Sequence, residues 1–315
     1  MTDLRHAHDA ARSIAAAALG HDPGHMSTAP SSSHHVYVGA DAVVKLIEAD
    51  GHARLNREIA LAPHLPAGLT APLLDSGVHR LGTRPIRYAC YARVPGTAPG
   101  IHLPGVDRAT ARALAEQAVQ RLLALHTWTP SGPVAELLAE PLDHGGFTGR
   151  EALVADVDAL ARLDRHGTVP RPLLDGLRAL AERAPHHARA HVPVHADCHW
   201  GNWLARDADV TALLDFEWAR FGEPADDWMF LVRFSGPHLE TVLDVVSRAT
   251  HTPVASLRAA CEIRETAHLV SDLRIALEHS DAQAQLLSTR LLSLDELVAG
   301  RYWWRAGLPR SVDAE

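Results

Sequence analysis

HVPVHADCHWGNWLARDADVTALLDFEWARFGEPADDWMFLVRFS, residues 191–235, sets polar side chains among apolar and aromatic ones in a way that a plain hydrophobic core would avoid. Three of them, His195, Asp197 and Asn202, form the pattern HxDxxxxN, and Asp215 opens the tripeptide DFE farther along. Two apolar runs with a polar turn between them separate the motifs, and this pattern predicts a β-hairpin. Its open end would place Asn202 nearly opposite Asp215, where an amide oxygen and a carboxylate can share one Mg²⁺ ion.

Asp197 is close enough to Asn202 in a loop to reach the same phosphate group and to orient an attacking hydroxyl. Phosphoryl transfer depends on in-line positioning and charge neutralisation more than on covalent help from the protein. A carboxylate base, a metal ion and a lysine are therefore its expected parts. The motif supplies the first two, so the lysine has to come from elsewhere in the chain.

Lys45 is the single lysine among the 30 lysine and arginine residues. A compact ammonium group acts as a point charge between phosphate oxygens, whereas a guanidinium is planar and forked, so this position is a candidate for phosphate contact. Lys45 lies in the second arm of a predicted hairpin, and Glu58 falls on the helix predicted next. We therefore expect an ion pair between Lys45 and Glu58.

The N-terminal third of the chain has the pattern of a small sheet with helices. We expect helices over residues 4–19 and 53–65, the second ended or kinked by Pro63, and strands over residues 34–38, 42–47, 74–78 and 86–94. Pro95 and Gly96 mark a boundary after the last strand. This division predicts an N-terminal nucleotide-binding lobe over residues 1–95 and a C-terminal catalytic and substrate-binding lobe over residues 96–315.

Helical patterns predominate after this boundary. Apolar residues recur at helical spacing over residues 111–125, and the sections 130–185 and 238–300 are also predicted to be helical. Thr148 and Ser293 each precede a glutamate by three positions, which is the spacing of a capping box. We expect a helix to begin at each of them.

The combination of HxDxxxxN, DFE, an upstream VVK and a helical glutamate resembles the aminoglycoside phosphotransferase family, which shares the protein-kinase-like fold. The segment GEPADD at residues 222–227, the Leu-His pair at residues 125–126 and the segment at residues 91–96 extend the resemblance to about residues 30–235. The resemblance implies a bilobal α+β protein. Its small N-terminal lobe would hold an antiparallel sheet and a helix, and its larger C-terminal lobe would be mainly helical.

The resemblance also implies a role for each residue of the motifs. Asp197 would be the catalytic aspartate, and Asn202 and Asp215 would hold Mg²⁺. Lys45 would contact the α- and β-phosphates of ATP, held in place by Glu58.

Further residues would support this site. His195 would be structural, and Asp227 would brace the catalytic loop through hydrogen bonds. Glu217 would assist the metal site or only shape it. The segment at residues 91–96 resembles the hinge between the lobes, where the backbone of Ala92 and Val94 would hold adenine.

Two features depart from the family pattern. Ala196 stands where the family usually has glycine, so the loop has to accept a Cβ atom. A serine run stands where a protein kinase has a glycine-rich loop, and its hydroxyl and N–H groups, with Ser32 and Ser33 as the candidates, would meet the phosphates.

These features predict an ATP-dependent O-phosphotransferase that uses Mg²⁺ and modifies a hydroxyl of an antibiotic of the aminoglycoside or nucleoside type. A kinase of a primary metabolite such as choline, homoserine or a sugar would share every motif. A nucleotide-binding regulator without activity is the third possibility, although the intact motif residues argue against it.

The acceptor would be contacted by the helices that follow the metal site. Asp272, Glu278 and Asp281 are the candidates, and their charge would suit a polycationic aminoglycoside. A nucleoside or peptide antibiotic is equally compatible with these residues.

Composition excludes several other classes of partner. The net charge of −8 argues against nucleic acid, because binding to a phosphate backbone requires a basic patch. No apolar run has the length of a membrane span, and the N-terminus lacks the basic end of a signal peptide. Three widely spaced cysteines do not indicate a disulfide framework. We expect a cytoplasmic monomer or homodimer.

A zinc site is the competing interpretation of the central stretch. His191, His195 and His199 recur every four residues beside Cys198, which would suit a metal-binding helix. Pro193 and its flanking valines favour an extended chain instead, where this spacing does not converge on one metal ion.

Other polar and aromatic residues of the stretch have structural interpretations. Asp226 is assigned to the surface. The four tryptophans are assigned to the core, with one of them a candidate for lining the substrate cleft: Trp200, Trp203, Trp218 and Trp228.

Overall fold

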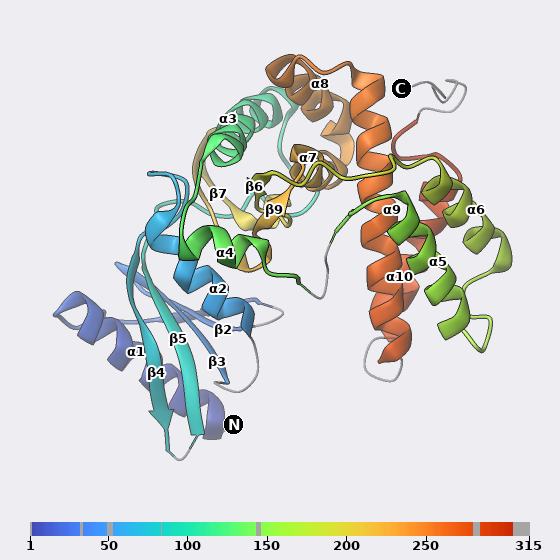
Figure 1. Ribbon diagram of the computed structural model, residues 1–315. Coiled ribbons are helices and arrows are strands. Elements are labelled where there is room, and N and C mark those ends of the chain that lie inside the picture. Colours follow the sequence, from blue (N-terminus) through green and yellow to red (C-terminus); the bar gives the residue numbers. More distant parts are fainter. Residues whose placement is uncertain are drawn as a thin grey trace.

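The computed structural model describes residues 2–31, 34–48, 53–82, 84–142, 146–279 and 284–304, which form two lobes (Figure 1). The N-terminal lobe contains a five-stranded antiparallel sheet in the order β1-β2-β3-β5-β4. Its strands are β1 (Ser27–Ala29), β2 (His35–Val38), β3 (Ala42–Glu48), β4 (Leu73–Leu81) and β5 (Arg84–Ala92). The four strands predicted from the sequence correspond to β2, β3, β4 and β5, and β1 is an additional short edge strand.

Alternation along β3 decides which side chains face which helix. Val44 and Leu46 point to one face, where they pack with the alanine-rich helix α1 (Thr2–Leu19). Lys45 is paired with Ala89 on β5, and Ala89 packs with Leu55 of α2 (Ala53–Leu61). Lys45 therefore projects from the face that α2 covers.

The helix predicted over residues 53–65, ended or kinked by Pro63, is present. Its α-helical part ends at Leu61, and the chain continues as the 3₁₀ turn η1 (Ala62–His64). Pro63 explains the change, because proline lacks the N–H group that an α-helix would need there.

The C-terminal lobe consists of eight described helices and two small antiparallel pairs of strands. Its helices are α3 (Arg108–Thr127), α4 (Pro133–Ala139), α5 (Arg150–Leu163), α6 (Arg171–Glu182), α7 (Pro224–Arg233), α8 (Leu239–Thr250), α9 (Val254–Glu278) and α10 (Ala284–Val298). The strands β6 (Val192–Val194) and β9 (Arg220–Gly222) pair with each other, as do β7 (Trp203–Arg206) and β8 (Asp209–Leu213). Three 3₁₀ turns, η2 (Trp200–Asn202), η3 (Phe216–Trp218) and η4 (Gly236–His238), complete the lobe.

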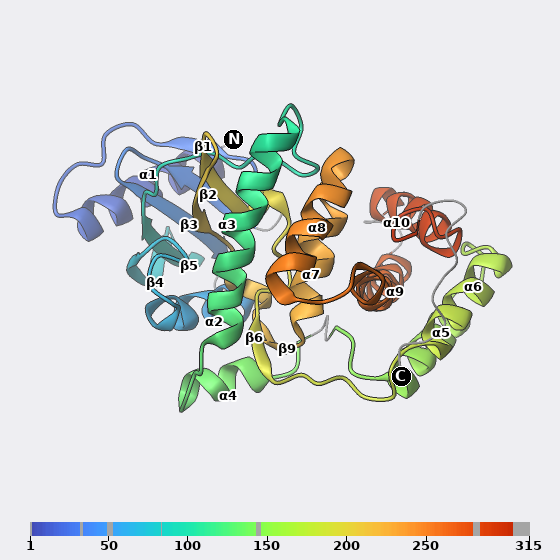
Figure 2. The ribbon, with the colours of Figure 1, turned by 90° about the horizontal axis from the view of Figure 1, so that it is seen from above.

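Helix α9 is the centre of the C-terminal lobe. It lies against α7 and α8 on one side and against α5, α6 and α10 on the other (Figures 1 and 2). Trp200, Trp203 and Trp228 are buried in the hydrophobic core beside α3, as the sequence predicted. No helix in the described part of the chain combines the length and apolar character needed to cross a bilayer.

The chain crosses between the lobes next to β7. Thr97 forms two backbone hydrogen bonds of 2.9 Å with Ala205, one in each direction. Gly96 has a φ of 127°, and a Cβ atom there would lie 2.8 Å from the carbonyl oxygen of Ala205. Only glycine allows the crossing strand to approach β7 so closely.

Both predicted capping boxes are wrong. Helix α5 begins at Arg150 with Gly149 as its cap, and the carbonyl group of Thr148 accepts a backbone hydrogen bond of 3.2 Å from Ala188. Ser293 lies inside α10 and therefore does not open a helix.

Asp226, which the sequence assigned to the surface, is buried. Its side chain accepts a hydrogen bond of 3.0 Å from the backbone N–H of Glu223, and the two residues form the capping box of α7. The buried position follows from the ion pairs that Asp226 makes with arginines of other elements.

The C-terminal end of the described chain is held to α9 by a buried polar contact. The Trp303 indole N–H donates to Glu265, which also accepts a hydrogen bond of 2.6 Å from Arg233. We expect Trp303→Phe to lower the free energy of unfolding by about 1–3 kcal/mol, because the buried carboxylate loses a donor. Urea denaturation would measure the loss. Leu292→Ala, at an exposed position of α10, is the control and should change stability by less than about 0.5 kcal/mol.

Candidate active site

Lys45 forms a buried ion pair with Glu58, as predicted. Its Nζ atom lies 2.8 Å and 3.0 Å from the two carboxylate oxygens of Glu58 and 3.3 Å from Oδ1 of Asp215. Burial by itself would lower the pKa of Lys45, but the two carboxylates raise it above its ordinary value. The ammonium is thus charged and linked to both lobes, because Glu58 comes from α2 and Asp215 from the segment after β8.

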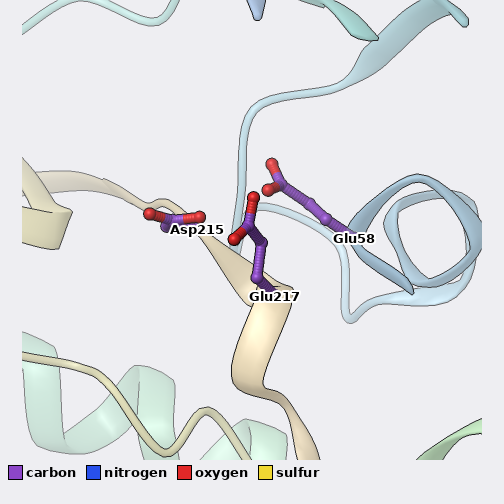
Figure 3. A group of neighbouring side chains, drawn as sticks. All are labelled: Glu58, Asp215 and Glu217. Carbon is purple, nitrogen blue, oxygen red and sulfur yellow. The ribbon is translucent and has the colours of Figure 1, made fainter. Parts of the chain in front are cut away.

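Three carboxylates from these two lobes point toward one another. Oxygen atoms of Glu58, Asp215 and Glu217 all lie within 4.8 Å of one another (Figure 3). Glu217 on η3 is also paired with His34, whose Nε2 atom lies 2.8 Å away. The concentration of negative charge and of hard oxygen atoms fits a divalent cation such as Mg²⁺.

Asn202 and Asp215 flank the open end of the β7–β8 hairpin, as the sequence predicted. The backbone N–H of Leu214 donates to the Asn202 carbonyl oxygen over 2.8 Å, which places Asp215 next to Asn202 across the hairpin. The Asn202 amide nitrogen donates to the Asp197 carbonyl and carboxylate oxygens, at 2.8 and 3.1 Å. Its amide oxygen is consequently the atom left to bind a cation.

Asp227 braces the loop that carries Asp197. It is fully buried and accepts hydrogen bonds from the backbone N–H groups of His195 (3.1 Å) and Ala196 (2.7 Å) and from Nε2 of His126 (2.8 Å). Ala196 has a φ of 64°, in the left-handed region. Its Cβ atom is therefore tolerated at the cost of some backbone strain, which the two bonds to Asp227 offset.

His195 has a structural position, as expected. Its Nε2–H group donates to the Leu214 carbonyl oxygen over 2.9 Å, and its Nδ1 atom accepts from the backbone N–H of Asp197 over 3.2 Å. Burial lowers the pKa of the imidazole, which keeps it in the neutral form that these bonds require. His195 thereby ties the Asp197 loop to the end of β8.

Asp197 lies between two cavities. The larger, of about 520 Å³, opens between the lobes, and the smaller, of about 140 Å³, lies inside the C-terminal lobe. Within the described chain, Asp197 is the one residue that lines both. Burial and the neighbouring charge of Asp215 raise the pKa of Asp197 well above its ordinary value, against the hydrogen bond from Asn202.

Most of the residues predicted to bind nucleotide line the large cavity. Lys45, Glu58 and Asp215 line one end of it, and Ala92 and Val94 of the predicted hinge line another part. Ser32 and Ser33 lie outside the described residues, although Ser31 lines the cavity.

Of the three residues predicted to contact the acceptor, one lines a cavity. Asp272 on α9 lines the small cavity together with Asp197. Glu278 is exposed at the last position of α9 and is not among the residues that line either cavity. Asp281 lies outside the described residues.

Sequence reasoning missed several residues of the two cavities. His34 was assigned only to a strand, and nothing in its neighbourhood marked it as the partner of Glu217. Trp218 lines the small cavity, in agreement with the suggestion that one tryptophan of the motif would do so. Arg220 and Arg264 also line this cavity, and no local pattern distinguished them from the other arginines.

The extended conformation expected for residues 192–194 is present as β6, with His191 exposed before it and His195 buried after it. Within the described residues, the cluster that fits a metal ion consists of carboxylates, without histidine or cysteine. The geometry therefore gives no support to a zinc site.

Comparison with known proteins agrees with this arrangement. Residues 29–262 match the model of a family described as phosphotransferase enzymes. A search of curated protein sequences gave no match.

Solved structures with the same fold include three aminoglycoside phosphotransferases. The GDP and kanamycin complex of APH(2″)-IIIa has a TM-score of 0.71 at 18% identity, over 89% of this chain and 94% of that chain. A thermostable mutant of APH(4)-Ia has a TM-score of 0.63 at 19% identity, over 94% of this chain and all of that chain (100%). ADP-bound APH(2″)-Ib has a TM-score of 0.60 at 13% identity, over 87% and 94% of the two chains. These similarities establish the bilobal kinase-like fold.

Asp197 and Asp227, the aspartate that braces its loop, should affect stability in opposite directions. Burial opposes ionisation of Asp227, but the bonds from His126, together with His195 and Ala196, lower its pKa. A carboxyl whose pKa falls on folding stabilises the protein above the unfolded pKa of about 4 and loses that contribution as the pH drops through the folded pKa. We expect Asp227→Asn to cost about 1.5–3 kcal/mol at pH 7 and progressively less in acid.

Asp197→Asn provides the comparison, because the pKa of Asp197 is raised. A carboxyl whose pKa rises on folding opposes folding at every pH above its unfolded pKa of about 4, so the variant should be more stable than the original protein at pH 7. This difference should disappear below about pH 4. Denaturant titrations of both variants at a series of pH values would show whether each substitution raises or lowers the free energy of unfolding. An equal loss of stability in the two variants would contradict opposite pKa shifts of Asp197 and Asp227.

Proposed function

This chain belongs to the phosphotransferase enzyme family, and we propose that it transfers the γ-phosphoryl group of ATP to a hydroxyl group of a small molecule, with an antibiotic as the acceptor. The enzyme is a small-molecule kinase. The solved structures of similar fold carry GDP with kanamycin or ADP, which supports a nucleotide in the cavity between the lobes. A kinase of a primary metabolite would use the same residues, so the acceptor distinguishes the two.

The position of Asp197 between the two cavities is the observation that carries this proposal. Transfer between two substrates requires a group that reaches both, and Asp197 lines the large cavity beside Lys45 and Asp215 and the small cavity beside Asp272. The large cavity would hold ATP and the small one the acceptor. The reacting oxygen and phosphorus atoms would then meet at Asp197.

Nucleotide binding falls to groups of both lobes. Lys45 would neutralise phosphate oxygens, and Glu58 keeps its ammonium in place. Val94 and Ala92 would hold adenine through their backbone. Asn202 and Asp215 would hold Mg²⁺, with Glu217 close by; the ion would neutralise charge on the phosphates.

Asp197 would orient the acceptor hydroxyl and take its proton. The hydroxyl oxygen forms the new bond to the γ-phosphorus, the bond from that phosphorus to the β–γ bridging oxygen breaks, and ADP leaves. A raised pKa makes Asp197 a better proton acceptor than an ordinary carboxylate. Its loop is fixed by Asp227, so the carboxylate needs no rearrangement during the reaction.

Asp197→Asn should lower turnover by about 10²–10⁴-fold, because it removes the proton acceptor, and should leave ATP binding intact. The measurement is ADP release from Mg-ATP with aminoglycosides, nucleoside antibiotics and small alcohols as acceptors, using the variant as the blank. An acceptor that gives strong ADP release with the original protein and none with the variant would support the proposal. Unchanged turnover in the variant would remove Asp197 from its catalytic role.

Asp215→Ala should abolish the dependence of nucleotide affinity on Mg²⁺, because it deletes a carboxylate of the proposed metal site. Titration of a fluorescent ATP analogue with and without Mg²⁺ would measure this dependence. Asp209→Ala, at an exposed position of the same hairpin, is the control and should retain it. Metal dependence that survives in Asp215→Ala would place the ion elsewhere.

A further inference from the structure

We propose that the acceptor presents one uncharged, hydroxyl-bearing ring to Asp197, and that Arg290 enforces this specificity by neutralising Asp272. This inference rests on the proposed phosphotransfer and concerns only the acceptor. It differs from the expectation that Asp272 would bind a polycation.

The small cavity has room for one ring of the acceptor. An enclosed cavity of about 150 Å³ holds one benzene molecule, and the cavity beside Asp197, which is partly open, measures about 140 Å³. Phe147, Trp218, Met229 and Phe230 form its apolar lining. Apolar side chains of this kind leave water when they pack against an uncharged ring.

Asp272 is the acidic residue of this cavity that would attract a cation, and the chain already neutralises it. Its Oδ2 atom lies 2.5 Å from Nε of Arg290 on α10 and 3.3 Å from Nε2 of His268, one turn earlier on α9. Asp272 is 7% exposed. A substrate amine would have to displace Arg290 from a largely buried pair, and the guanidinium would then lack its partner.

Asp226, a second carboxylate in the cavity wall besides Asp197, is paired with arginine as well. Asp226 is buried at the start of α7, 3.9 Å from Arg220 and 3.7 Å from Arg264. Arg264 in addition pairs with Glu223 and lies over the ring of Phe147. These contacts fix Asp226 as part of the wall.

The acidic side chains of the cavity wall other than Asp197 are therefore each paired with arginine. Asp226 faces Arg220 and Arg264, and Asp272 faces Arg290. A carboxylate that is already paired attracts a cation less than one that is not. A polyamine that reached Asp226 or Asp272 would have to lose water and displace an arginine.

The experiment measures binding of kanamycin, as a polycationic probe, to the full-length protein saturated with Mg²⁺ and a non-hydrolysable ATP analogue. Calorimetry should show weak binding to the original protein. Arg290→Gln frees Asp272 and should tighten kanamycin binding about tenfold, the effect of one hydrogen bond to a charged group.

Three further variants isolate the charge of Arg290. Arg290→Lys keeps the positive charge and should bind kanamycin as weakly as the original protein. Adding Asp272→Asn to Arg290→Gln should reverse the gain. Arg301→Gln, at an exposed arginine paired with Asp295, should change nothing. Thermal melting of each variant would confirm that it is folded.

Three results would overturn the inference. The first is a kanamycin affinity of folded Arg290→Gln equal to that of the original protein. The second is tight kanamycin binding by the original protein that Asp272→Asn abolishes. The third is phosphorylation of kanamycin that Asp272→Asn abolishes, which would leave the proposed function standing. Absence of ADP release with every acceptor would count against the proposed function, while the binding experiment would still decide the role of Arg290.

Discussion

The buried ammonium group of Lys45 links the two lobes, and the arrangement of the active site depends on this contact. It contacts Glu58 from α2 and Asp215 from the end of β8, so one group from the sheet meets a carboxylate from each lobe. Burial of any one of the three without the others would be costly, because an isolated charge loses its hydration. The three groups are therefore held together, and this requirement places the segment that carries Asp215 next to β3 and α2.

The second constraint lies within the C-terminal lobe. Asp227 at the start of α7 holds the backbone on either side of the His195–Ala196 peptide bond, and His126 at the end of α3 completes its hydrogen bonds. Helix packing thus fixes a loop with a strained left-handed residue. Because α7 also packs on α9, the wall of the small cavity and the position of Asp197 are set by the same core.

Pairing of charge determines what the small cavity can recognise. An acidic residue attracts a cation only if its charge is not already neutralised, and here Arg220, Arg264 and Arg290 come from β9, α9 and α10 to neutralise Asp226 and Asp272. If these arginines lay elsewhere, the same aspartates could form a cation site. The number of acidic residues in a helix therefore does not predict the class of acceptor unless their pairing with arginines is known.

The sequence by itself determined the motifs and the local elements that carry them. HxDxxxxN and DFE lie at the ends of a single hairpin, and the β-strands and α3 follow from short-range patterns. These features could therefore be predicted, along with Lys45, Glu58, Asn202 and Asp215. Tertiary structure alone decided where α5 begins, the burial of Asp226, the pairing of His34 with Glu217, and the neutralisation of Asp272 by Arg290. Each of these depends on contacts between residues distant in the chain, whose energies exceed a local capping or exposure preference and leave no signal in the neighbouring residues.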